Sequence, residues 1–119
     1  MNVVDSSAWL EYFAGTDRAD LFAAVIEDYE TLIVPSICLY EVFKKVLRER
    51  GEDNAIRVFS FMSLGRVVDL DFSLALEAAR HPLPLADSII YATALRFGAI
   101  LWTQDRHFES IPEARYFAK

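Results

Sequence analysis

Cysteine and histidine are scarce in this chain. Cys38 is the single cysteine, and His81 and His107 are the only histidines. One cysteine cannot form a disulfide within the chain, so a fold held together by disulfides is excluded. The usual tetrahedral zinc site needs four cysteine or histidine ligands, and these three residues cannot supply them. Structural zinc is therefore not expected.

Glycine and proline are also few, at four residues each, which argues against a disordered or low-complexity chain. The 54% hydrophobic and 25% charged content is that of a globular protein with a substantial core. A length of 119 residues leaves room for one domain, residues 1–119, and no separate binding module. The N-terminal segment has no basic leader, and Arg96 interrupts the longest late apolar stretch. We therefore expect a cytoplasmic protein that has no contact with a membrane.

Basic residues are outnumbered, with 12 Lys and Arg against 18 Asp and Glu, and the net charge is -6. No positive field of the whole protein attracts nucleic acid, so a polyanionic substrate would need a local cation. Aromatic residues are numerous, with nine Phe, five Tyr and two Trp. This number leaves some aromatics free for a partner surface, and we expect an oligomer or a tight complex.

Short apolar runs alternate with segments of helical periodicity. The most regular helix has Leu39, Val42, Val46 and Leu47 on one face and ends at Gly51. The predicted strands are NVVD (2–5), TLIVP (31–35), RVVDLD (66–71), AILWT (99–103) and ARYF (114–117). The predicted helices begin near Ser6, Asp17, Ser36, Ala55, Phe72 and Leu85. This alternation predicts an α/β sandwich in which helices flank a mainly parallel sheet.

Three acids lie where a sheet of this kind binds ligands, outside the carboxyl ends of its strands. Asp5 ends the first predicted strand, Asp105 follows the strand AILWT by two residues, and Asp87 lies in the first turn of the helix after Pro84. Acids in a first turn are also favoured by the helix dipole, so Asp87 has an alternative role as a helix cap. Glu41 shares a helix face with Lys44, Lys45 and Arg48. An ordinary solvated surface with a Glu41–Lys45 pair explains that pattern equally well.

Carboxylates that converge on one point repel each other unless a cation lies between them. Oxygen ligands of this kind suit Mg²⁺ or Mn²⁺. Such an ion activates water, stabilises charge on a phosphate and supplies locally the positive field that the whole protein lacks. If the acids converge, the sequence predicts metal-dependent hydrolysis of a phosphodiester.

Four segments carry a resemblance to PIN-domain proteins, and more closely to VapC-type toxin ribonucleases of type II toxin–antitoxin pairs. The first two are VVDSSAWLEYF, with an Asp closing the first strand, and YEVFKK around Glu41. The third is LPLADSIIYATAL around Asp87, and the fourth is LWTQDRHFESI, a Thr-x-Asp-x-x-Phe element. Together they span nearly the whole chain, and the last two are the more specific. The resemblance implies a PIN-like three-layer sandwich.

The resemblance also implies the site and its partners. Asp5, Glu41, Asp87 and Asp105 would form a metal site for Mg²⁺ or Mn²⁺ that cleaves RNA, with Thr103 and Ser6 in support. Family members are generally homodimers that a small antitoxin binds and inhibits. The phosphates of RNA are expected to meet basic side chains beside the cleft, namely Lys44, Lys45, Arg48 and Arg106.

Two serines and one histidine near these acids give weaker indications of chemistry. Ser6 and Ser7 lie outside any Gly-x-Ser-x-Gly context and are expected to cap a helix. His107, beside Asp105, is expected to be solvated, as histidines in polar loops usually are, and acid–base catalysis is its alternative role. Two other functions stay open. One is a receiver-like phosphoacceptor domain, although Ser6 stands where a second acid is expected after the first strand. The other is a PIN-fold binding module without catalysis.

Overall fold

The computed structural model describes all residues from Met1 to Lys119. Five short strands form one sheet in the order β3-β2-β1-β4-β5, and every neighbouring pair is parallel. The strands are β1 (Asn2–Val4), β2 (Leu32–Pro35), β3 (Arg66–Val68), β4 (Ile100–Thr103) and β5 (Ala114–Tyr116). The prediction of a parallel α/β sheet is confirmed.

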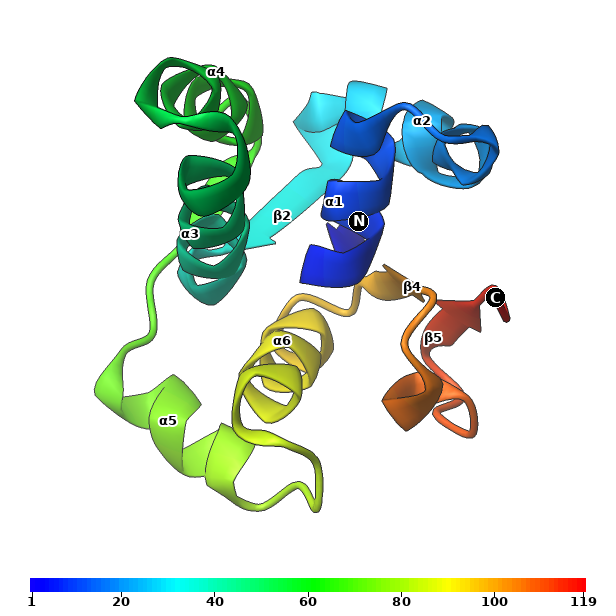
Figure 1. Cartoon of the computed structure of the whole chain (residues 1–119). Coiled ribbons are helices and arrows are strands. Elements are labelled where there is room, and N and C mark those ends of the chain that lie inside the picture. Colours follow the sequence, from blue (N-terminus) through cyan, green and yellow to red (C-terminus); the bar gives the residue numbers. More distant parts are fainter.

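Six α-helices connect and cover the strands (Figure 1). They are α1 (Ser6–Ala14), α2 (Asp20–Glu27), α3 (Ser36–Arg50), α4 (Glu52–Met62), α5 (Phe72–Ala79) and α6 (Leu85–Arg96). The chain moves in one direction across the sheet from β1 to β3 and then returns to β4. Right-handed crossovers therefore place α1 to α4 on one face and α5 and α6 on the other. No helix combines the length and apolarity needed to cross a membrane.

Of the three inner strands, β1 and β2 are almost completely buried on both faces, which explains why they are continuous apolar runs. In β4 the burial alternates, with Ile100 exposed and Leu101 and Thr103 buried. Val3, Val34 and Leu101 are completely buried on the three inner strands, and the rings of Trp9 and Phe22 pack into the same core. This core of 22 buried residues holds the carboxyl ends of β1, β2 and β4 at one edge. The side chains that follow these strands are thereby fixed close to one another.

Some predicted boundaries were wrong because other side chains make the caps. Asp5 caps α1 by accepting a hydrogen bond from the N–H of Ala8, so Ser6 and Ser7 lie inside the helix and do not cap it. Thr16 caps a 3₁₀ turn that precedes α2, and α2 itself has no side-chain cap. The strand predicted at 66–71 ends at Val68, because Asp71 turns away to cap α5.

Candidate active site

Asp5 lies between β1 and α1, and its side chain accepts hydrogen bonds on both oxygens. Oδ1 accepts from the N–H of Ala8 at 3.1 Å and from the Ser7 hydroxyl at 2.7 Å. Oδ2 accepts from the Thr103 hydroxyl at 2.6 Å. The residue is only 2% exposed, so these three donors replace the water that an exposed carboxylate would have.

Asp105 follows β4, and the threonine that binds Asp5, Thr103, also forms a hydrogen bond with Asp105. Its backbone N–H donates to Thr103 Oγ1 at 2.9 Å, and its own Oδ1 accepts from the backbone N–H of His107 at 2.9 Å. The second contact caps a short 3₁₀ turn, η3 (Arg106–Phe108). Thr103 thus forms hydrogen bonds with both Asp5 and Asp105, and the supporting role that the resemblance implies stays a prediction.

The side chain of Asp87 extends from the first turn of α6 toward Asp105. It caps nothing, because α6 follows Pro84 and has no side-chain cap. His107 Nδ1 lies 2.8 Å from Asp87 Oδ2 and 3.0 Å from Asp105 Oδ1. The expectation that His107 is merely solvated was therefore wrong, because its ring nitrogen lies between two carboxylates that come from separate elements.

Glu41 lies on the side of α3 that faces the start of α1. Its Oε1 accepts a hydrogen bond from the Ser6 hydroxyl at 2.6 Å. The alternative pair with Lys45 does not form, because Lys45 lies 3.9 Å from Glu49 instead. Glu41 is thus oriented by the residue that follows Asp5, although it is not part of the tight group formed by Asp87, Asp105 and His107.

Burial and like charge act together on the site's carboxyl groups. Desolvation is the main cause that raises the pKa of Asp5, its hydrogen bonds oppose that rise, and the charge of Asp105 adds to it. Desolvation and the charge of Asp105 raise the pKa of Asp87 to about 6, even though His107 lowers it. The charge of Asp5 also raises the pKa of Asp87, which shows that the three carboxylates interact.

The donor set fits a hard divalent cation. One ligand atom from each of Asp87, Asp105 and His107 lies within 4.8 Å of the others, and Asp5 is close enough to interact with both acids through its charge. Carboxylate oxygens favour Mg²⁺ or Mn²⁺, and a cation among them would offset the mutual repulsion that, besides burial, raises the pKa of Asp5 and of Asp87. Cys38 lies buried beneath the site, where burial and the nearby acids hold the pKa of its thiol well above the ordinary value.

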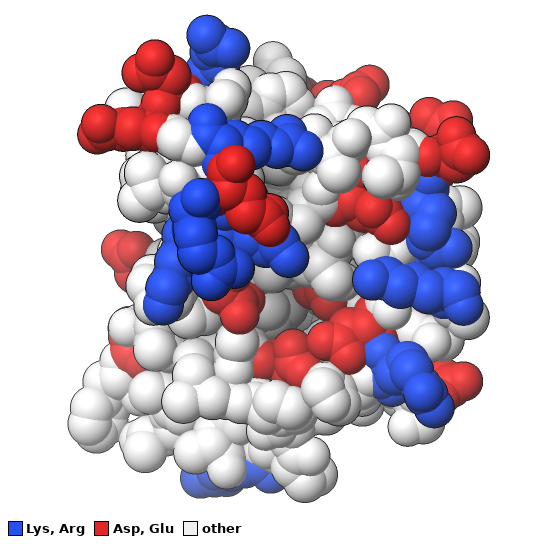
Figure 2. Space-filling model, viewed as in Figure 1, with Lys and Arg blue, Asp and Glu red and all other residues white.

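Basic side chains lie beside the acids. Lys and Arg gather over α3, and acidic side chains border a hollow between α3 and α6 (Figure 2). Lys44, Lys45 and Arg48 line a cavity of about 240 Å³ together with Tyr40 and Glu41. Arg106 is exposed on η3. The structure thus places three of the four predicted phosphate contacts beside Glu41.

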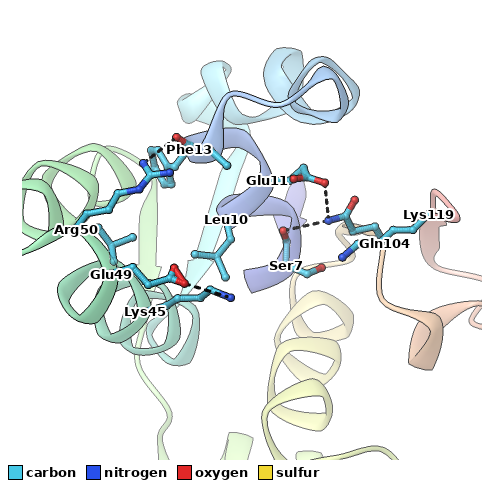
Figure 3. A pocket seen from close by; sticks show the side chains of 11 residues that line it. Ser7, Leu10, Glu11, Phe13, Lys45, Glu49, Arg50, Gln104 and Lys119 are labelled. Atoms are coloured by element: carbon cyan, nitrogen blue, oxygen red, sulfur yellow. Dashed lines mark hydrogen bonds and ion pairs between the residues drawn. The ribbon is translucent and has the colours of Figure 1, made fainter.

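A larger cavity of about 400 Å³ lies between α1 and α3, and Figure 3 shows Ser7, Lys45 and Gln104 on its walls. Gln104 is 4% exposed and was not predicted from the sequence. Its Oε1 accepts from Arg18 Nε at 2.9 Å, and its Nε2 donates to the backbone oxygen of Ser7 and to Glu11 at 3.4 Å each. Gln104 therefore ties the loop of Asp105 to the helix that begins after Asp5.

Solved structures with the same fold come from toxin–antitoxin systems. A chain of a toxin–antitoxin complex from Klebsiella pneumoniae has a TM-score of 0.81 and 19% identity, with 100% of both chains covered. VapC20 of Mycobacterium tuberculosis, a sarcin-ricin loop cleaving toxin, has a TM-score of 0.76 and 20% identity over 94% of this chain and 95% of its own. DNA-bound VapBC from Salmonella typhimurium has a TM-score of 0.71 and 20% identity over 99% and 98%.

The family comparison agrees with the fold. No curated protein sequence matches the chain significantly. The model of the PIN domain matches residues 3–114, which includes β2, β3 and β4 completely, β1 from Val3, the first residue of β5 and all four acids at the site. The chain therefore belongs to the PIN-domain family and has the fold of VapC toxins.

Proposed function

We propose that this protein is a Mg²⁺- or Mn²⁺-dependent endoribonuclease and the toxin of a type II toxin–antitoxin pair. The observation that carries the proposal is the convergence of Asp5, Asp87 and Asp105 from three separate elements onto one edge of the sheet. Buried carboxylates are costly, and burial together with the charge of Asp105 raises the pKa of both Asp5 and Asp87, so a cation or protons must offset the charge of this group.

Asp5, Asp87, Asp105 and Glu41 would hold the ion. Bound there, it would lower the pKa of a water molecule and stabilise charge on the phosphate. Thr103 holds Asp5 in place, and Ser6 holds Glu41. The water oxygen would add to phosphorus and give up a proton to solvent or a nearby base, one P–O ester bond would break, and the departing ribose oxygen would take up a proton to become a hydroxyl. No covalent bond to the protein is expected.

The basic side chains would hold the substrate. Lys44, Lys45, Arg48 and Arg106 offer positive charge next to the acids, where the RNA backbone must lie for its phosphate to reach them. Phosphate contacts fix position without reading bases. These residues are therefore expected to raise affinity for every RNA sequence by similar factors.

The proposed partners are a small antitoxin and a second copy of this chain. The relatives' structures include toxin–antitoxin complexes. The face near α5 is mostly free of charge (Figure 2), and Phe72, Leu76 and Leu85 are 82%, 53% and 75% exposed. Large exposed apolar side chains in one region are typical of an interaction surface. Light scattering on the purified protein tests the dimer, and a monomer at micromolar concentration would contradict it.

Replacement of single acids tests the nuclease. We expect Asp5→Asn and Asp87→Asn to abolish cleavage of a structured RNA in Mg²⁺ while the circular dichroism spectrum is retained. Asp69→Asn is the matched control, because Asp69 is exposed and lies outside the site. Full activity of both site variants would refute the assignment. Mn²⁺ binding without cleavage by the wild type would favour the inactive binding module.

The receiver-like alternative does not agree with the fold. A receiver has the strand order 2-1-3-4-5, whereas this sheet has β1 in the middle in the order β3-β2-β1-β4-β5. The residue after Asp5 is Ser6, whose hydroxyl binds Glu41, so no second acid follows the first. Membership of the PIN-domain family removes this alternative.

A further inference from the structure

Tyr40 lies on α3 directly before Glu41. Its side chain is exposed and does not pack into the core. The core-facing side of α3 carries Cys38, Leu39, Val42 and Val46, all buried, and Tyr40 lies outside this face with 58% of its surface exposed. The stability of the helix therefore does not require an aromatic ring at this position. An exposed ring beside an active site needs another explanation, and its flat faces are available to a ligand.

Lys44 fixes the orientation of the Tyr40 ring. Its Nζ donates to the Tyr40 hydroxyl at 3.2 Å and lies 5.4 Å from the ring centroid. The ammonium is thus nearer to the hydroxyl than to the ring centre, so it holds one end of the ring and leaves much of the ring surface open. A ring that is already oriented loses less conformational freedom when a ligand stacks on it.

Lys44 and Arg48 continue from Tyr40 along one stripe of the helix. Residues four apart lie on the same face of an α-helix and are separated by roughly 6 Å along its axis. Neither Lys44 nor Arg48 has a carboxylate within 4.0 Å, whereas Lys45 on the next stripe pairs with Glu49. Two uncompensated cations in a protein of net charge -6 form a local positive track.

We propose that Tyr40 is a stacking platform for an unpaired nucleobase and that Lys44 and Arg48 hold the phosphates of the same RNA strand. These three residues, with Glu41 and Lys45, line one cavity of about 240 Å³. Single-stranded RNA is bound by this combination of aromatic faces and cations. Since Glu41 is adjacent to Tyr40, a base on the ring places its backbone next to the acids. The inference rests on the proposed nuclease function and identifies its substrate as an unpaired segment.

RNA binding by a variant that cannot cleave the RNA tests the stacking platform. The Asp5→Asn protein is mixed in Mg²⁺ with single-stranded RNAs of about ten nucleotides that carry 2-aminopurine at successive positions. We expect strong quenching at one position, as a base stacks on Tyr40. Adding Tyr40→Leu should remove this quenching and weaken binding roughly 5- to 100-fold, while Tyr40→Phe, which keeps the ring but loses the hydroxyl that Lys44 contacts, should preserve the quenching.

Three further variants separate stacking from general effects on RNA binding. Tyr29→Leu is the matched control, because Tyr29 is 48% exposed but does not lie on α3, and it should leave affinity and quenching unchanged. Lys44→Gln and Arg48→Gln should each lower the dependence of log K on log salt concentration by about 0.7, as expected for one lost phosphate contact to a single strand. An unchanged salt dependence in both would overturn the phosphate track.

The outcomes distinguish this inference from the proposed function. If the wild type cleaves RNA but Tyr40→Leu alters neither quenching nor affinity, the platform is wrong and the nuclease stands. If Tyr40→Leu spares RNA binding and weakens a complex with a protein partner, the ring belongs to a protein interface and the platform is again wrong. If the wild type neither cleaves nor binds RNA, the proposed function fails and the platform fails with it.

Discussion

The hydroxyl of Thr103 lies 2.6 Å from Asp5 Oδ2 and at the same time accepts the backbone N–H of Asp105 at 2.9 Å. One buried oxygen thus connects two acids that are a hundred residues apart in the sequence. Thr103 is completely buried, so water cannot replace either hydrogen bond. This side chain thus adds to the backbone hydrogen bond from Asp5 to Trp102, which also holds the two acids near each other.

Thr103→Val should therefore damage both stability and the site. Valine has nearly the same shape but leaves Asp5 Oδ2 and the Asp105 N–H each without its hydrogen-bond partner. We expect the free energy of unfolding to fall by about 1–3 kcal/mol, and metal affinity to fall as well. Urea unfolding and Mn²⁺ titration measure the two effects. Thr103→Ser keeps the hydroxyl and is the control that should retain metal affinity. Equal metal affinity in both variants would contradict the role given to this hydroxyl.

The metal-free protein should lose stability as the pH rises from about 4 to about 6. The pKa of Asp87 is raised to about 6, so in this window the folded state holds a proton that the unfolded state has released. The loss from Asp87 is about 1–3 kcal/mol and is complete above that window. Thermal unfolding in a chelator measures it. Asp87→Asn should flatten the pH profile, and a profile unchanged by this substitution would show that other groups cause the loss.

His107→Ala should raise the pKa of Asp87 above its present value of about 6, because the charge and hydrogen bond of His107 now lower that pKa. Carbon-detected NMR titration of the metal-free protein reports the carboxyl group directly. His81→Ala is the control, because His81 packs on Tyr91 with ring centroids 4.8 Å apart and does not touch the acids. A pKa that stays the same or falls in His107→Ala would mean that the imidazole does not stabilise the Asp87 carboxylate.

Gly65 lies before β3 at a close approach of the backbone to β2. A Cβ atom at this position would be 2.8 Å from Val34 Cγ2 and 3.1 Å from the carbonyl oxygen of Leu32. Gly65→Ala should therefore lower the free energy of unfolding by about 1–3 kcal/mol, as expected for overpacking. Chemical denaturation measures this change. Ser60→Ala, an exposed change on α4, is expected to stay within about 0.5 kcal/mol. An equally small effect of Gly65→Ala would show that the segment before β3 can shift away from β2 at little cost in stability.

Much of the fold follows from local patterns in the sequence. The helix from Ser36 to Gly51 and the helix after Pro84 were predicted from apolar periodicity and their end signals, and the structure confirms both. The caps were harder to predict. Asp5 displaces its neighbouring serines as the cap of α1, because a carboxylate that ends β1 already points at the N–H of Ala8. Such competition between adjacent cap-forming residues depends on the exact path of the chain.

The site was less accessible to prediction than the fold. Asp5, Asp87 and Asp105 could be selected because each lies at the carboxyl end of a strand or in the first turn of a helix. The position of His107 could not be read from its polar loop, since its contact with Asp87 depends on how α6 packs against the sheet. Gln104 likewise has no local signal, because its partner Arg18 lies before α2, far away in the sequence.

The central place of β1 affects how the chain folds during synthesis. β1 is made before the other strands of this sheet, yet one of its two edges pairs with β4, which is made after β2 and β3. That edge stays open until β4 has left the ribosome, and an open edge can pair with strands of other chains. Asp105 follows β4, so the nascent chain has an incomplete set of acids until then. The order of synthesis thus delays assembly of the acidic site until β4 and the segment after it are made.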